Sequence, residues 1–246
     1  CSNPRPMFHF VLTDSYLRRN PHSAAPASTT TVAPNVGRVY PRSRLMPRFN
    51  DQHAANRFTS ANGLTFYRDN LLGPGYYGNA FVSEPVHNLV HRIVLDPKGL
   101  TFSSHRASGE ESSEFLASSD NWFRPTMIRT GPDGGLWIAD MYRGVIEHPQ
   151  YFYEGNFKKL NVRAGDKMGR LYRVVPAATR PRSLAPLKSL EPGDSAGLAA
   201  STASPNGWIR DMAHQRLANT RPAGAAPHLA RLALEAKNSQ GRVQAL

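Results

Sequence analysis

The chain has 246 residues, and 40% of them are hydrophobic, so it can bury the core of one large domain, or of one domain with a smaller neighbour. Its single cysteine, Cys1, excludes an internal disulfide, a CxxCH haem attachment and a cysteine-based zinc site within these residues. The net charge of +12 comes from separated arginines, without a lysine-rich run or an RNA-binding fingerprint, so we expect a basic solvated surface rather than a nucleic-acid partner.

No apolar run is long enough to span a bilayer, and no N-terminal secretion signal is visible. The sequence begins at Cys1 without a methionine and ends at Leu246 inside a helical pattern. We therefore interpret it as an internal fragment of a longer protein. Any membrane association is then expected to come from parts outside this sequence.

The N-terminal part predicts one strand and one long loop. Residues 6–16 contain an apolar run that we interpret as a strand, with Phe8, Phe10, Val11 and Leu12. Residues 18–58 are rich in Pro, Ser, Thr and Ala and show almost no periodicity, so we expect a long surface loop there.

Residues 59–106 predict a first blade of a β-propeller. Strands are expected at residues 63–67, 79–83, 88–95 and 101–106, with turns at Gly73-Pro74-Gly75 and Asp96-Pro97-Lys98-Gly99. The third of these strands shows the period of two that a strand requires, with Leu89, His91, Ile93 and Leu95 in alternation.

Residues 122–176 predict a second unit with the same pattern. A strand through Met127 and Ile128 meets a tight turn at residues 131–134, in which Asp133 is a turn residue. A second strand follows at residues 136–139, and a third returns at residues 170–175. The insertion between them, residues 147–167, predicts a short helix at 153–160. Short strands in repeated units favour a propeller.

The composition then changes to a helical tail. Residues 177–192 predict a Pro-rich linker, and residues 193–246 predict helices near 208–217, 229–236 and 240–246. Short amphipathic helices separated by Pro and Gly favour a HEAT-type repeat. The predicted fold is therefore mainly β with an α tail: residues 1–176 form the last blades of a partial β-propeller, and residues 193–246 begin a HEAT-type α-solenoid.

Propeller topology brings the loop after the second strand of one blade to the same rim as the entry to the next blade. We expect polar and aromatic residues from three connections to meet at this rim: Glu84, His87 and Asn88; Trp122 and Arg124; Asp140, Tyr142, Arg143 and His148.

These residue types suggest chemical roles. His87 is the candidate catalytic base, because imidazole titrates near neutrality. Arg124 and Arg143 can hold a carboxylate or stabilise an oxyanion, and the alternative is that they form structural ion pairs with Asp120 and Asp140. The aromatic side chains can stack on a sugar or a planar cofactor, or can simply pack the channel. Glu84, Asn88 and Asp140 supply oxygens, but their spacing does not require a metal.

Five segments carry a family resemblance. GLTFYRDNLLGPGYYGNAFVSEPVHNLVHRIVLDPKGLTF resembles the quinoprotein sugar-dehydrogenase propellers. FLASSDNWFRPTMIRTGPDGGLWIADMYRGVIEHPQ, with GRLYRVVP, SPNGWIRDMAHQRLA and the opening CSNPRPMFHFVLTDSYLRRNP, resembles the large membrane-bound dehydrogenases of planctomycete and verrucomicrobial type. In that family a sorbosone/glucose-dehydrogenase-like propeller precedes HEAT repeats and a CxxCH c-type haem domain.

The resemblance implies an exported, periplasmic or membrane-associated oxidoreductase. Its substrate would be a sugar or related alcohol, its cofactor pyrroloquinoline quinone, and its electron acceptor a c-type haem outside this sequence. The earlier blades, where the relatives place their catalytic base, are also absent, so the fragment alone is expected to be inactive. The alternative is a non-catalytic propeller/HEAT module that binds polysaccharide or protein.

Overall fold

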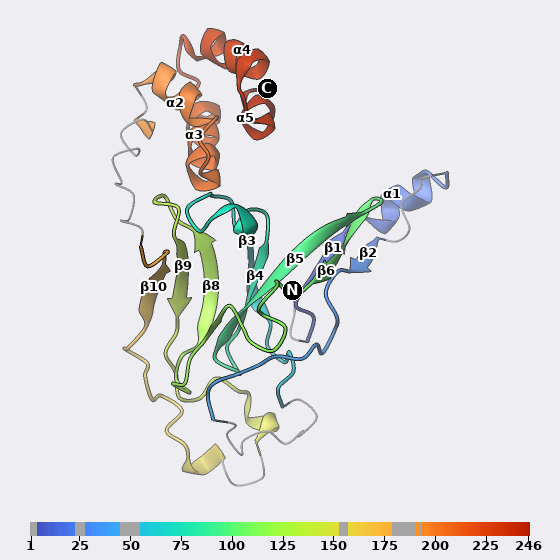
Figure 1. Ribbon diagram of the computed structural model, residues 1–246, viewed down its shortest axis with the longest axis vertical. Coiled ribbons are helices and arrows are strands. Elements are labelled where there is room, and N and C mark those ends of the chain that lie inside the picture. The colour runs from blue at the N-terminus through green and yellow to red at the C-terminus, as the bar shows by residue number, and fades with distance from the viewer. Residues whose placement is uncertain (1–3, 23–27, 45–54, 153–156, 179–189, 192) are drawn as a thin grey trace. The chain divides into compact units, whose positions relative to one another are not determined.

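The computed structural model describes residues 4–22, 28–44, 55–152, 157–178, 190–191 and 193–246 (Figure 1). The chain divides into two compact units. The first comprises residues 1–66, 78–129 and 138–172, and the second comprises residues 67–77, 130–137 and 173–246.

The first predicted blade forms an antiparallel sheet, and its four predicted strands are confirmed. These are β3 (Asn62–Phe66), β4 (Ala80–Glu84), β5 (Leu89–Lys98) and β6 (Thr101–His105), neighbours in that order. The short strand β7 (Leu116–Ala117) also pairs with β5. Every residue of β4 is buried, and its apolar residues Ala80, Phe81 and Val82 place side chains on both faces of the sheet.

The predicted turn at residues 96–99 is wrong in its position. Strand β5 continues to Lys98, and the hairpin turns at Gly99 and Leu100, where Gly99 adopts a φ of 59°. In a two-residue hairpin the closing pair, here Lys98 and Thr101, is the hydrogen-bonded one, so Pro97 lies in a pair that needs no N–H. Proline therefore fits within this strand.

The second predicted unit forms a three-stranded sheet in the order β10-β9-β8. Its strands are β8 (Pro125–Thr130), β9 (Leu136–Asp140) and β10 (Arg170–Val174), as predicted to within two residues at each end. Asp133 is confirmed as a turn residue, because its Oδ1 accepts the Gly135 N–H at 3.1 Å and Gly134 has a φ of 85°.

The two sheets approach each other within the first unit at Gly63 of β3. A β-carbon at this position would lie 2.7 Å from both the Ser83 hydroxyl and the Thr126 carbonyl oxygen, and the residue has a φ of 62°. Only glycine satisfies both conditions. The mainly β fold with a helical tail is thus confirmed, and its curled antiparallel sheets fit a partial propeller-like arrangement.

The N-terminal prediction is only partly right. Strand β1 (Phe8–Phe10) is confirmed, but helix α1 (Asp14–Arg19) replaces the rest of the predicted strand. Its acidic first turn and basic last turn match the helix dipole.

The predicted loop at residues 18–58 also contains strand β2 (Thr29–Thr31), which pairs with β1. Val32, Val39 and Phe58 join the core of the first sheet, so this segment is not a simple surface loop. Residues 23–27 and 45–54 lie outside the described residues.

Two 3-10 helices occupy the insertion after β9, namely η3 (Pro149–Tyr151) and η4 (Phe157–Lys159). The predicted helix at 153–160 is replaced by η4 over the residues of that range that the structure describes. Residues 153–156 lie outside the described residues. A third 3-10 helix, η2 (Pro74–Tyr76), occupies the predicted Gly/Pro turn after β3.

The tail of the second unit consists of four helices: α2 (Ser195–Ser201), α3 (Gly207–Thr220), α4 (Ala225–Glu235) and α5 (Ser239–Ala245). The last three confirm predicted helices, but α4 begins before Pro227 because proline is tolerated in a first turn, where N–H groups lack helical partners. The sequence prediction missed α2. The HEAT-type repeat stays a prediction, and most of the predicted linker lies outside the described residues.

Asn206 fixes the start of α3 within the second unit. Its Oδ1 accepts the Ile209 N–H at 3.1 Å, and its Nδ2 donates to the Gly131 carbonyl at 2.8 Å. Arg68 forms a bidentate pair with Asp211 on the same helix, at 2.6 and 3.0 Å. The exposed Arg68–Asp211 pair is a weak contributor, whereas the buried amide of Asn206 bridges two elements.

We expect Asn206→Ala to destabilise the protein by about 2 kcal/mol, because it removes a helix cap together with the buried hydrogen bond that links α3 to the Gly131 carbonyl. Asp194→Ala at the exposed cap of α2 should cost about 1 kcal/mol or less. Urea unfolding of both variants, followed by circular dichroism, measures the difference. Equal losses would contradict the bridging role.

Glu114 ties residues 38–40 to the first sheet. Its fully buried Oε1 accepts the Tyr40 N–H at 2.9 Å and Arg106 Nη2 at 3.0 Å, and its Oε2 lies 2.7 Å from His91 Nδ1. Burial opposes ionisation of this carboxyl, but the hydrogen bonds and charges of His91 and Arg106 outweigh burial, so its pKa is lowered from 4.5.

The lowered pKa of Glu114 predicts a loss of stability in acid. Its contribution is present in full above the unfolded-state pKa near 4.5 and is lost as the pH falls through the lower folded-state pKa. Glu114→Gln should therefore flatten the acid limb of a plot of unfolding midpoint against pH. The pKa of Glu110 shifts in the opposite direction, because burial raises it. Glu110→Gln should therefore leave the acid limb in place.

Candidate functional site

The connections predicted to share one rim do meet in the first unit, and Arg124 joins them. Its Nε donates to the Arg143 carbonyl at 2.9 Å, and its Nη2 donates to the Gly144 carbonyl at 3.0 Å. Its Nη1 donates to the carbonyls of Pro85 and Val86 at 2.8 and 3.5 Å. The side chain of Arg124 is fully buried, so its guanidinium holds the backbone of two loops together.

Asn88 makes a similar connection between the two predicted blades. Its backbone is left-handed, with a φ of 57°, a conformation that asparagine tolerates better than most residues. Its buried Nδ2 donates to the carbonyls of Asn121 and Phe123 at 3.0 and 2.6 Å. Asn88 therefore anchors the turn segment that leads into β8.

Glu84 and His87 are also buried, and both face backbone groups. Glu84 Oε2 accepts the N–H groups of Thr59 and Ser60 at 3.0 and 2.8 Å. His87 Nε2 accepts the Asn56 N–H at 3.0 Å, so this nitrogen carries no proton, and Nδ1 lies 3.6 Å from Glu84. With 2% of His87 exposed, its imidazole is enclosed by protein on both sides.

Asp140 organises the end of β9. Its Oδ1 accepts the N–H groups of Arg124 and Tyr142 at 2.7 and 2.8 Å. Its Oδ2 pairs with Arg170, at 3.0 Å from Nη2 and 3.2 Å from Nε. Asp120 and Asp140 thus do take part in ion pairs, and Arg170 is a partner of both.

The groups that reach solvent beside this buried scaffold form what we call the aromatic rim: Trp122, Tyr142, Arg170 and Tyr172. The rings of Trp122 and Tyr142 have centroids 5.6 Å apart. The guanidinium carbon of Arg170 lies 3.7 Å from the Tyr142 ring centroid and 5.4 Å from that of Tyr172. Trp122 and Tyr172 are 37% and 38% exposed, so ring surface remains open to a ligand.

Trp122 and Tyr142 are among the predicted site residues, whereas Arg170 and Tyr172 are not. Residues two apart on a strand share a face, so Arg170 and Tyr172 of β10 could have been paired from their spacing. Nothing in the local sequence indicated that β10 lies beside the end of β9, because an insertion of about thirty residues separates them.

Electrostatics keeps the rim in one charge state at neutral pH. Burial is the largest single effect on the pKa of Arg170 and lowers it, but the hydrogen bond to Asp140 and the charge interactions with Tyr172, Asp140 and Tyr142 together outweigh burial, so the pKa is raised. Burial raises the pKa of Tyr172, and the nearby Arg170 only partly offsets it. Arg170 is therefore a cation and Tyr172 a neutral phenol.

The remaining two predicted site residues lie in the insertion after β9. Half-buried Arg143 donates from Nη2 to the Val162 carbonyl at 2.9 Å. Exposed His148 caps η3, where its Nδ1 accepts the Gln150 N–H at 3.3 Å. His148 therefore has a structural role at the start of this turn. Both stay candidate ligand contacts.

Two further kinds of site were sought. Among the described residues, no group of three or more His, Cys, Asp and Glu side chains is placed to hold a metal ion. In the same residues no helix has both the length and the apolar composition to cross a bilayer.

Arg124→Met should destabilise the protein by about 3 kcal/mol or more, because it removes the hydrogen bonds that a fully buried guanidinium donates to the carbonyls of Arg143, Gly144 and Pro85. Arg143→Met removes a half-buried guanidinium with one backbone bond and should cost about 1 kcal/mol. Chemical unfolding monitored by tryptophan fluorescence compares the two. A smaller loss for Arg124→Met than for Arg143→Met would show that the buried guanidinium does not clamp the loops.

Comparisons with known proteins complete the description of the site. No curated protein and no solved structure matches the chain. One family model matches residues 1–178, which covers both predicted blades and the aromatic rim. The chain therefore belongs to the family described as a domain of unknown function, DUF7133.

Proposed function

We propose that the aromatic rim binds a sugar or related alcohol, and that the chain is part of an exported quinoprotein-like oxidoreductase that oxidises this ligand. The observation that carries the proposal is the exposed, pre-organised group of three rings and one arginine beside two carboxylates. The sugar dehydrogenases that the sequence resembles motivate the redox part.

The rim has the physical properties of a carbohydrate site. Exposed aromatic faces pack against the C–H faces of a pyranose, and the two rings of Tyr142 and Tyr172 are held in place by the Arg170 guanidinium between them. Arg170 can donate to sugar hydroxyls, while Asp120, 3.7 Å from it and 42% exposed in its side chain, can accept from them. Hydroxyl pairs on adjacent carbons suit such a donor and acceptor.

Arg170 is charged but already balanced, which favours a neutral ligand. Its guanidinium lies 3.0 Å from the buried Asp140 carboxylate and 3.7 Å from Asp120. A ligand anion would compete with these carboxylates, whereas a neutral polyol only adds hydrogen bonds. This selects sugars and alcohols over acids at the rim.

The arginines at the predicted rim do not fit a polycarboxylated quinone. Such a group needs accessible guanidinium forks for its carboxylates. Arg124 is closed off by backbone carbonyls, Arg170 is balanced by carboxylates, and Arg143 is half-buried against Val162. On this proposal, the quinone and the c-type haem are held by other residues, and the rim supplies docking rather than electron transfer.

The enclosure of His87 and Arg124 favours a second candidate function. If the buried scaffold only shapes the rim, the chain is a non-catalytic module that binds polysaccharide. The two functions share the ligand class but differ in whether binding leads to oxidation. One set of experiments therefore tests both.

Trp122→Ala and Tyr172→Ala should each weaken binding of neutral sugars at least tenfold, because each removes an exposed stacking face. Glycan-array screening of the chain, followed by titration calorimetry on the best neutral sugar, measures this. Tyr16→Ala, which removes a 59% exposed ring from α1, is the matched control and should bind as wild type does. Binding that survives both rim substitutions would place the sugar site elsewhere.

Turnover separates the two functions. The full-length parent protein, supplied with pyrroloquinoline quinone and an artificial electron acceptor, should oxidise the sugar that the rim binds. Turnover that falls with Trp122→Ala supports the oxidoreductase. Sugar binding without quinone-dependent turnover supports the binding module instead.

A further inference from the structure

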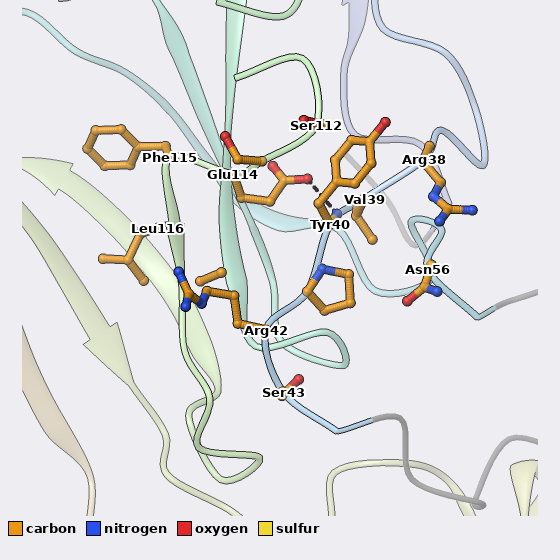
Figure 2. Close-up of a pocket in the computed structure, with 13 residues that line it drawn as sticks. Arg38, Val39, Tyr40, Arg42, Ser43, Asn56, Ser112, Glu114, Phe115 and Leu116 are labelled. Atoms are coloured by element: carbon orange, nitrogen blue, oxygen red, sulfur yellow. Dashed lines mark hydrogen bonds between the residues drawn. The ribbon is translucent and has the colours of Figure 1, made fainter. Parts of the chain in front are cut away.

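A cavity lies in the first unit, and none of the residues of the aromatic rim line it. It has a volume of about 800 Å³ and is lined by residues 38–43, Asn56 and residues 112–117 (Figure 2). This size is within the range of small-molecule sites.

The wall formed by residues 38–40 is held by three backbone bonds, so the cavity is pre-formed. The Arg38 carbonyl accepts Arg106 Nη2 at 2.7 Å, and the Val39 N–H donates to the Asn56 carbonyl at 3.0 Å. The Tyr40 N–H donates to Glu114 at 2.9 Å, the bond drawn dashed in Figure 2.

Among the described residues that line the cavity, the one carboxylate is already neutralised. Glu114 pairs with Arg106 at 3.0 Å and lies 2.7 Å from His91, and its side chain is fully buried. It therefore presents little negative charge to the cavity. Any net charge inside comes from the other lining residues.

Those residues are cationic. Arg38 and Arg42 both line the cavity and are exposed, and within the described part of the chain no carboxylate lies within 4 Å of either guanidinium. Figure 2 shows the Arg42 side chain extending toward Leu116 and the Arg38 side chain lying near Asn56. Arg38 and Arg106 also lie 5.7 and 4.8 Å from the Tyr40 ring centroid.

The uncharged lining complements a hydroxylated molecule. Ser43, Ser112 and Asn56 add hydroxyl and amide groups, while Leu116 and Ala117 add an apolar surface. A ligand that matches this lining carries a carboxylate for the arginines, hydroxyls for the polar groups and a C–H face for the apolar ones.

We propose that this cavity, here called the arginine pocket, binds a small hydroxylated carboxylate of the acidic-sugar type. Arg38 and Arg42 supply the positive charge that attracts the carboxylate, and the serines and Asn56 hold the hydroxyls. The pocket shares no residue with the aromatic rim, which favours neutral ligands, so failure of either site leaves the other unaffected.

Titration calorimetry of the chain with glucuronate, glucose, acetate and sulfate tests the ligand class. We expect glucuronate to bind at least tenfold more tightly than glucose, which lacks the charge, and than acetate or sulfate, which lack the C–H face and the ring hydroxyls. The affinity should fall as NaCl is raised, because partly exposed charges are screened. Equal binding of acetate or sulfate would reduce the pocket to a general anion site and overturn the proposal.

The double variant Arg38→Gln/Arg42→Gln should weaken glucuronate binding at least tenfold. The double variant Arg18→Gln/Arg19→Gln on α1 carries the same change in net charge and should bind as wild type does. If the pocket variant does not fold, the changes in amide NMR chemical shifts of the wild-type protein on adding glucuronate show where glucuronate binds. Shifts at Tyr40, Ser112 and Asn56 support the site, and shifts confined to other residues refute it.

Discussion

The structure of the rim depends on one buried interaction, the donation of hydrogen bonds by Arg124 to the backbone of two separate loops. A loop at the end of a strand carries carbonyl groups that neither sheet pairing nor water satisfies once the loop is buried. A guanidinium offers five donors in a fixed plane, so a single side chain can satisfy several such groups at once. Asn88 and Glu84 each satisfy fewer backbone groups: Asn88 donates to carbonyls, and Glu84 accepts from N–H groups.

This constraint separates two kinds of polar residue that look alike in the sequence. Charged side chains that satisfy the backbone are removed from solvent, and they give up the accessibility that catalysis needs. The side chains that remain accessible, Trp122, Tyr142, Arg170 and Tyr172, lie on the scaffold that the buried ones hold. A rigid, partly apolar surface of this kind is suited to recognising a ligand shape more than to transforming it.

The sequence was informative where physical rules are local. Period-two alternation located β5, Gly and Asp located the turn around Asp133, and helical spacing located α3. It was uninformative where partners are distant. The partner of Asp140 is Arg170, thirty residues away, and the burial of Val39 and Phe58 depends on a sheet that follows them in the chain. Rim convergence could be anticipated from topology, but whether Arg124 faces a ligand or a carbonyl could not, because both environments suit a guanidinium.

The attachment of Tyr40 to Glu114 has a further thermodynamic consequence. The same carboxylate that anchors the arginine-bearing wall is a titratable group paired with His91 and Arg106. Protonating it weakens the anchor, so acidification should loosen the wall and lower the affinity for an anion together. By linkage, an anion that binds only the anchored wall must in return make Glu114 harder to protonate. Anion binding in the cavity and resistance of this part of the chain to acid are then thermodynamically coupled, so that each increases the other.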